Sequence, residues 1–257
     1  MKIVVLVKEV PDTYAERKLD LETGLADRAA SEAVLDEIGE RALEVALAYA
    51  DSNDAEVVVL SMAPDSAAAT IRKALAMGAS SAVHVADPAL AGADLALTAR
   101  TLAAAIRRTG FDLVVTGNLS TDGNGAVLPA MLAELLDVPN ATALSSVEIT
   151  PESVSGTRNT DDSTMRVSAM LPAVISITEA LPTARFPNFK GIMAAKKKPF
   201  ETLVAADLSI EPDDFSVAMS IMTAIAEKPP RTAGVKITDE GDGGTKIAEY
   251  LIENRLV

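Results

Sequence analysis

Cysteine and tryptophan are absent from this chain of 257 residues, and histidine occurs once. Without cysteine there can be no disulfide, thiolate-bound metal, iron–sulfur cluster or cysteine nucleophile. The lone His84 excludes a histidine-rich metal site, and its place in the apolar run AVHVA predicts a structural side chain. We therefore expect no bound metal. The lack of cysteine also fits the reducing conditions of the cytoplasm, where we expect the protein to be.

Basic residues are outnumbered, with 23 Lys and Arg against 37 Asp and Glu, which gives a formal net charge of −14. Nucleic-acid-binding proteins carry a basic surface, so we expect no nucleic acid partner. No apolar run reaches the roughly 18 residues of a membrane helix, so a membrane protein is not expected either. The opening residues MKIVVLVKEV are too short a run for a signal peptide and predict a strand.

Hydrophobic residues make up 49% of the chain, but only five Phe and three Tyr are among them, so the core must be aliphatic. In the first 140 residues, short β-branched runs alternate with helical patterns. Strands are predicted at 2–8, 55–62, 80–87 and 111–117, and helices at 31–50, 65–79, 93–110 and 130–138. Continuous apolar strands with crossover helices indicate a parallel sheet covered on both faces.

The pattern changes after residue 140. Four short strand-like runs follow without helices between them, ATALSSVEI, SVSGTRN, STMRVSAM and PAVISIT. They predict antiparallel strands added to the parallel sheet. Residues 181–212 hold four prolines and are predicted to be irregular, and the chain ends in an amphipathic helix, TKIAEYLIENRL.

One loop stands out, TGNLSTDGNGAVLPAM at residues 116–131, which links a predicted strand to a predicted helix. Ligands of open parallel sheets bind beyond the carboxyl ends of the strands. A glycine-rich turn before a helix presents free N–H groups to an anion. Pro129 has no N–H and leaves residues 125–128 open, so their backbone N–H groups can face a phosphate.

The same loop contains no Lys or Arg, and GNLSTDGNG is not a GxGxxG motif. A loop that transfers phosphate groups carries a lysine. These features are typical of a nucleotide holder without hydrolysis chemistry, but they are equally consistent with a plain connection between strand and helix. Asp122 likewise suits either a binding role or an ordinary Asp-Gly turn.

Five stretches of the sequence resemble one family in order along almost the whole chain. They are VKEVPDT (7–13), ATIRKALAMGAS (69–80), TGNLSTDGNGAVLPAMLAELL (116–136), RFPNFKGIMAAKKKPFE (185–201) and PPRTAGVKI (229–237). The chain resembles the β subunit of an electron transfer flavoprotein of the bacterial, non-bifurcating type. GIMAAKKK and PPRTAG carry the resemblance most specifically, because simple physical reasoning would not predict them.

The resemblance implies an obligate heterodimer with an α subunit, which holds most of a shared FAD, while this chain binds AMP as a structural nucleotide. It implies that electrons come from primary dehydrogenases, such as the acyl-CoA dehydrogenases of fatty acid β-oxidation. They pass to a membrane quinone oxidoreductase, which is a transient partner. The chain would be an electron carrier with no catalytic residues of its own.

Carried over by position, the resemblance assigns AMP to residues on several predicted strand ends. Leu6 and Met62 would flank the adenine, Asp36 would accept from ribose or adenine, and the backbone of 125–128 would hold phosphate. The full set is Leu6, Asp36, Ser61, Met62, Gly117, Ser120, Asp122, Gly123, Gly125, Ala126, Val127 and Leu128. Many family members have Thr or Gln near 127–128, so here only the backbone contacts to phosphate are expected.

Three more residues are assigned to partners. Phe189 matches an exposed apolar anchor that docks into a dehydrogenase, and such anchors are typical hot spots. Arg158 matches a position near the flavin domain of the α subunit, but Asn159 replaces the Glu that follows it in the family, which we expect to loosen that contact. Tyr14 is either a contact to the flavin ring or a surface tyrosine. The run Lys196–Lys198 is either solvated or in contact with an acidic partner.

We expect an α/β three-layer sandwich with a mostly parallel sheet, of the Rossmann-like or adenine-nucleotide-hydrolase-like type, with antiparallel edge strands and an extended C-terminal arm. Residues 1–184 would form the nucleotide-binding domain, and 185–257 the partner-recognition loop and an arm packing on the α subunit. One alternative is a bifurcating β subunit with a second FAD in this pocket. Another is a stand-alone adenine-nucleotide-binding protein, although the sequence lacks the lysine or SGGxDS-like loop of such enzymes.

Overall fold

The computed structural model describes residues 1–15, 17–214, 220, 222–231, 233–234 and 236–257. The chain forms two compact units, Met1–Thr223 and Ala224–Val257. The first unit contains the main sheet and the cavity discussed below.

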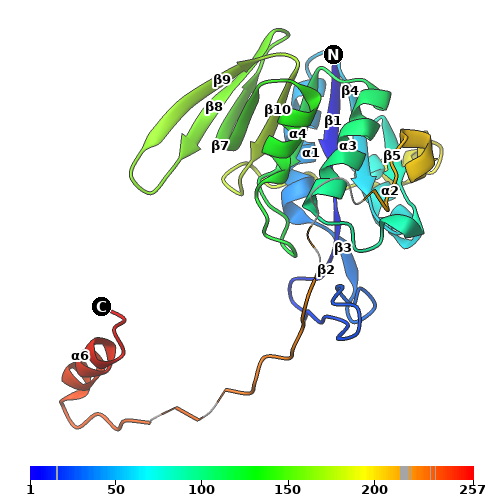
Figure 1. The fold of residues 1–257 in the computed structure, drawn as a ribbon. Coiled ribbons are helices and arrows are strands. Elements are labelled where there is room, and N and C mark those ends of the chain that lie inside the picture. The colour runs from blue at the N-terminus through cyan, green and yellow to red at the C-terminus, as the bar shows by residue number, and fades with distance from the viewer. Residues whose placement is uncertain (16, 215–219, 221, 232, 235) are drawn as a thin grey trace. The chain divides into compact units, whose positions relative to one another are not determined.

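The first unit is built on a nine-stranded sheet in the order β11-β5-β4-β1-β6-β10-β7-β8-β9 (Figure 1). The pairs from β11 to β7 are parallel, whereas β8 and β9 are added antiparallel at the β7 edge. The strands are β1 Lys2–Leu6, β4 Glu56–Met62, β5 Ser81–Val85, β6 Leu113–Gly117, β7 Asn140–Ile149, β8 Ser153–Asn159, β9 Thr164–Met170, β10 Ala173–Ile177 and β11 Phe200–Leu203. The predicted mostly parallel sheet with antiparallel edge strands is confirmed. One of the four runs predicted as antiparallel after residue 140 was wrongly placed, because β10 lies inside the sheet and pairs in parallel with β6 and β7.

Helices cover both faces of the parallel part of the sheet, as predicted (Figure 1). One face packs against α1 Glu37–Ala50 and α2 Ala68–Met77, the other against α3 Leu95–Thr109 and α4 Leu128–Leu136. Successive side chains of a strand point to opposite faces of the sheet, so each face has its own hydrophobic core. In β1, Ile3 and Val5 pack in the core beneath α1 and α2, and Val4 packs in the core beneath α3 and α4. Both cores are aliphatic. The connections also contain three short 3₁₀ turns, η1 Asp65–Ala67, η2 Pro88–Leu90 and η3 Ala205–Leu208.

The helix predicted at 31–50 starts later than its apolar pattern suggested. Residues Ala33–Leu35 form strand β3, which pairs antiparallel with β2, Glu9–Pro11, in a second small sheet. Helix α1 begins at Glu37, after Asp36. The helical prediction over 31–36 was wrong because β-branched Val34 finds a strand partner in Val10, a tertiary contact that local periodicity does not contain.

The prediction of irregular chain over 181–212 was also wrong. This stretch holds helix α5, Phe189–Ala195, strand β11 and turn η3. Strand β11 extends the main sheet by pairing in parallel with β5. Four-residue strands and seven-residue helices are too short to give a periodic signal, and the prolines of 181–212 favour irregular structure by local rules.

The second unit contains helix α6, Gly243–Glu253. Its apolar side chains Ile247, Tyr250 and Ile252 are exposed. Residues 232 and 235, within the stretch PPRTAGVKI, lie outside the described residues.

Candidate nucleotide site

The carboxyl ends of β4, β1 and β6 lie side by side, because β1 pairs with β4 on one side and with β6 on the other. The chain runs outward from β1 to β4 and β5 and then returns to place β6 on the opposite side of β1. Strand order therefore reverses at β1, and such reversal points leave a crevice where ligands of α/β sheets bind.

A cavity of about 410 Å³ occupies this crevice, within the size range of small-molecule sites. Its lining comes from the ends of three strands, the first turns of α1, α3 and α4, and the loop that follows β6. Of the twelve residues assigned to AMP, nine line it: Leu6, Asp36, Ser61, Met62, Gly117, Ser120, Gly125, Ala126 and Leu128.

Asp36 places a buried carboxyl beside the cavity. The residue is 2% exposed and directly precedes α1. Its Oδ2 accepts a hydrogen bond of 3.0 Å from the Thr121 N–H, but its Oδ1 has no partner among the described residues. Burial raises the pKa of Asp36 above that of a solvated aspartate, although the hydrogen bond to Thr121 opposes the shift.

Ser61, near the end of β4, is a second buried polar residue of the lining. It is 1% exposed, and its hydroxyl likewise has no partner in the described part of the chain. Buried polar groups are nearly always hydrogen-bonded, to protein or to something bound. Two unpaired groups bordering one cavity therefore indicate that a polar ligand or ordered water belongs there.

The loop between β6 and α4 is fixed to its surroundings at its beginning. The Asn118 N–H donates to the Ile177 carbonyl over 2.8 Å, and the Arg17 guanidinium donates to the Thr121 carbonyl. Within the loop, the Ser120 hydroxyl accepts from the Gly123 N–H at 3.2 Å. These contacts hold the first half of the loop, and the second half, residues 124–128, leads directly into helix α4.

That second half has the backbone conformation of an anion-binding nest. Asn124 and Ala126 have φ angles of +49° and +55°, whereas Gly125 between them lies outside the left-handed region. Helix α4 begins at Leu128 with a proline in its first turn. The backbone N–H groups of 125–128 donate to no acceptor in the described part of the chain. Successive free N–H groups of this kind form a concavity for an anion.

Lys8 is a lining residue that sequence reasoning missed. Its Nζ lies 2.7 Å from Asp122 Oδ1 and 3.5 Å from Ser120 Oγ. Burial alone would raise the pKa of Asp122, but the hydrogen bond and charge of Lys8 outweigh it and hold that pKa below its usual range. The loop contains no basic residue, as its sequence shows, and Lys8, two residues after the end of β1, supplies one. Local sequence held no signal for this pairing, because Lys8 was predicted within the strand 2–8 and Asp122 is 114 residues away.

Three residues assigned to AMP lie on the loop but do not line the cavity: Asp122, Gly123 and Val127. The start of α3 contributes lining that the sequence did not suggest, including Asp94 and Thr98. Asp94 caps α3 by accepting from the Leu97 N–H over 2.9 Å. The proximity of this helix start follows from strand order, which local sequence does not reveal.

The three residues assigned to partners do not line the cavity. Tyr14 is fully exposed, and Phe189, the first residue of α5, is 79% exposed. Arg158 donates within the chain, to the Thr142 carbonyl at 2.7 Å and to the Thr142 hydroxyl at 3.2 Å. Its neighbour Asn159 accepts from the Thr164 hydroxyl at 3.0 Å. In the parts of the chain that are described, no helix combines the length and apolarity needed to cross a membrane.

Known proteins resemble the chain over its whole length. The electron transfer flavoprotein domain family matches residues 23–208. The electron transfer flavoprotein subunit beta of Mycobacterium tuberculosis is 46% identical over 263 aligned positions, which cover 99% of each chain. That of Mycobacterium leprae is 45% identical with the same coverage. Subunit CarD of the caffeyl-CoA reductase-Etf complex of Acetobacterium woodii is 33% identical, over 83% of this chain and 82% of its own. On this likeness the chain belongs to the electron transfer flavoprotein family, as a β subunit.

Proposed function

We propose that this chain is the β subunit of a heterodimeric electron transfer flavoprotein of the non-bifurcating type. It holds AMP in the cavity at the ends of β4, β1 and β6, and it helps to enclose an FAD held mostly by the α subunit. Electrons enter from primary dehydrogenases such as acyl-CoA dehydrogenases and leave to a membrane quinone oxidoreductase. The chain provides binding surfaces and no catalytic residue, and it works in the cytoplasm.

The free N–H groups of 125–128 support this proposal most directly. They suit a phosphate group, which accepts several hydrogen bonds and favours the positive end of α4. Lys8, near the same loop, adds positive charge, although Asp122 offsets much of it. A phosphate held mainly by backbone is bound without being activated for transfer, which fits a structural nucleotide.

The rest of the lining fits the nucleoside half of AMP. Leu6 and Met62 are half-buried apolar side chains at the ends of β1 and β4, suited to the faces of an adenine ring. The unpaired groups of Asp36 and Ser61 provide one acceptor and one hydroxyl for the polar edges of ribose or base. The AMP half of an FAD carries the same chemical groups, so a second FAD is the alternative that an experiment must separate.

The surfaces proposed to bind partners are those where large apolar side chains are exposed. Phe189 is an exposed aromatic side chain on a short helix, suited to enter an apolar pocket of a dehydrogenase. The exposed apolar side chains of α6 suit burial against the α subunit. FAD, when bound, supplies the one-electron chemistry. Tyr14 is proposed to contact the flavin ring, and Arg158 is proposed to lie near the flavin domain of the α subunit.

Nucleotide content tests the proposal. The chain is co-expressed with its α partner, and the purified complex is denatured so that FAD and AMP can be measured by chromatography. One FAD and one AMP per heterodimer is the expected result. Two FAD and no AMP would place the protein among bifurcating flavoproteins. A chain that stays monomeric, resists proteolysis and binds an adenine nucleotide without the α subunit would instead favour the stand-alone alternative.

A further inference from the structure

Residues 185–198, here called the recognition segment, combine exposed side chains with a firmly held backbone. Phe186 and Phe189 are 95% and 79% exposed, and Ile192 and Met193 of α5 are about half exposed. Exposed apolar side chains that gather on one segment are typical of an interaction site. Polar contacts hold the backbone of this segment at both of its ends.

Arg185 fastens the start of the segment to α1. Its Nε and one terminal nitrogen each lie 2.8 Å from an oxygen of Glu44, which forms a bidentate pair. The second carboxylate, Asp51, lies 2.8 Å from the same terminal nitrogen. The Arg185 backbone N–H also donates to Glu44 at 3.0 Å. Bidentate charged hydrogen bonds of this kind fix orientation as well as position.

Lys198 fastens the end of the segment to α2. Its Nζ donates to the carbonyls of Leu75, Gly78 and Ala79 at 2.9, 3.2 and 2.6 Å. These carbonyls end α2 and begin the turn after it, so the ammonium satisfies acceptors that the helix leaves open. Desolvation lowers the pKa of Lys198. The adjacent Lys196 and Lys197 remain exposed.

Between these ends, α5 lies directly against α2. The Gly191 position is so close that an added Cβ would be 2.3 Å from the Ala76 carbonyl oxygen. Arg72 of α2 donates to the Ala195 carbonyl at 3.2 Å. Asn188 caps α5 by accepting from the Gly191 N–H at 2.8 Å. These contacts fix the position of the α5 backbone on α2, and so they also fix which way its exposed apolar side chains point.

We infer that Arg185 and Lys198 are positioning residues, which hold the recognition segment so that Phe189 meets the electron-donating dehydrogenase already in its docking conformation. This inference rests on the proposed function. Neither residue touches the donor or a cofactor. Holding the segment in advance removes the cost of ordering it when the donor binds, so the two anchors raise affinity for the donor.

The test compares Lys198→Met and Arg185→Met with Lys197→Met in the heterodimer. The side chain of Lys197 belongs to the same charge run but is exposed, so its variant controls for charge. Hydrogen exchange of the 186–197 amides should become at least about tenfold faster in the two anchor variants and stay unchanged in the control. With the heterodimer as varied acceptor of an acyl-CoA dehydrogenase, KM should rise about fivefold to tenfold with kcat unchanged.

Two further results guard against a merely structural effect. FAD and AMP content should stay at wild-type levels in each variant, and Lys198→Arg, which keeps a donor at this position, should recover part of the lost affinity. Where Arg185→Met does not fold, Glu44→Gln weakens the same anchor with little change in shape.

Unchanged exchange in the anchor variants would overturn the inference, and so would faster exchange with an unchanged KM. Equal effects of Lys197→Met and Lys198→Met would do the same, because charge alone would then explain them. A wild-type heterodimer that no dehydrogenase reduces would count against the proposed function instead. In that case the exchange measurement still decides whether the two residues hold the segment.

Discussion

The cavity and the recognition segment differ in which groups lack a partner: polar groups at the cavity, and apolar side chains in the segment. At the cavity, the apolar side chains Leu6 and Met62 are half-buried, while Asp36 Oδ1, Ser61 Oγ and the N–H groups of 125–128 have no partner in the described chain. In the recognition segment, Arg185 and Lys198 are fully engaged by polar partners, while Phe186 and Phe189 are exposed. The first arrangement calls for a small polar ligand and the second for a protein surface.

This difference shows how the type of ligand, a small polar molecule or a protein, can be inferred before the ligand itself is known. Leaving a buried polar group unpaired costs about 1–3 kcal/mol, so two such groups that border one cavity indicate a ligand that pairs them. An exposed aromatic side chain costs less, and it contributes more to affinity when its backbone is already held in place. The predictions below separate the two regions, in order of decreasing effect.

Phe189→Ala should give the largest effect, confined to donor docking. Removing a central aromatic anchor commonly costs 2 kcal/mol or more, which corresponds to a rise in KM of about 30-fold for the heterodimer as electron acceptor. Stopped-flow and steady-state reduction by an acyl-CoA dehydrogenase measure it. FAD and AMP content should be unchanged.

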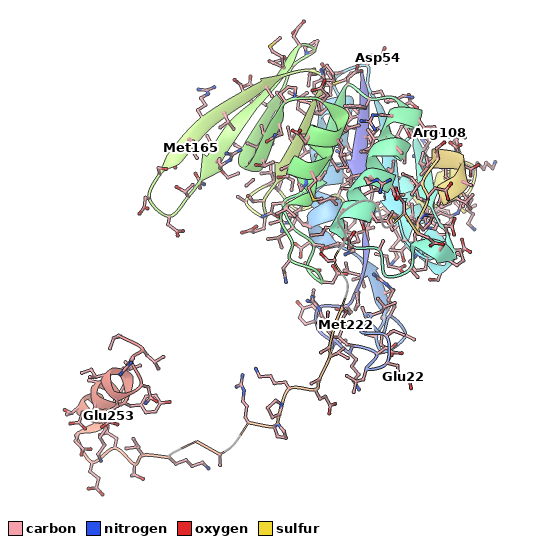
Figure 2. The ribbon with its side chains drawn as sticks, in the orientation of Figure 1. Glu22, Asp54, Arg108, Met165, Met222 and Glu253 are labelled. Atoms are coloured by element: carbon pink, nitrogen blue, oxygen red, sulfur yellow. The ribbon has the colours of Figure 1, made fainter. Side chains whose placement is uncertain are left out.

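Met170→Ala is the control for this prediction. Met170 is an exposed apolar residue that ends β9, whereas Met165, near the other end of that strand (Figure 2), pairs with Arg158. The Met170→Ala variant should be reduced at the wild-type rate. Loss of FAD or AMP from Phe189→Ala would show that Phe189 supports the fold, and the contrast between the two regions would fail.

Ser61→Ala should weaken AMP binding about tenfold without affecting donor docking, because it removes one hydrogen bond to the nucleotide. Thr101→Val is the matched control. The Thr101 hydroxyl is also buried and unpaired in the described chain, but Thr101 does not line the cavity. Its replacement should leave AMP affinity unchanged and stabilise the fold slightly. Isothermal titration of the AMP-depleted heterodimer measures the AMP affinity of both variants, and thermal unfolding measures their stability. Equal affinities for Ser61→Ala and wild type would exclude Ser61 from the site.

The smallest predicted effect is a pair of opposite pH dependences. Burial raises the pKa of Asp36, so the folded state binds its proton more tightly than the unfolded state does. Charged Asp36 therefore destabilises the fold at neutral pH, and this cost disappears as pH falls through its raised pKa towards about 3.9. Burial would also raise the pKa of Glu44, but the hydrogen bonds and charge of Arg185 outweigh it and lower that pKa. Glu44 thus stabilises the fold above about 4.3, and the contribution is lost as pH falls below that value.

Calorimetric unfolding of the AMP-depleted heterodimer between pH 3.5 and 8 measures these slopes. Asp36→Asn should be more stable than wild type at neutral pH, and Glu44→Gln less stable. Both differences should shrink on acidification, with that of Glu44→Gln persisting to lower pH. Differences of the same sign in the two variants would contradict the assignment of one carboxylate to an unpaired site and the other to an ion pair.

Local sequence predicted the parallel sheet, its covering helices and the antiparallel edge because each rests on patterns within about 15 residues. The helix ends near Gly78 and Gly110 follow equally local rules. What failed depends on distant partners: β3 needs β2, and β11 needs β5. Lys8 escaped notice for the same reason, since its partner Asp122 is 114 residues away. Most of the assigned cavity lining came from resemblance, and spacing alone would have left the loop ambiguous.

Strand order gives the recognition segment one more property. Strands β10 and β11 follow each other in sequence, but β6, β1, β4 and β5 separate them in the sheet. The chain between them must bridge five inter-strand spacings, about 24 Å, across the face that carries α1 and α2. Loop closure of that kind is unfavourable until the intervening strands are in place. We therefore expect the surface that carries Phe189 to be among the last parts of the molecule to form, and a partner that binds this surface to select chains whose sheet is already complete.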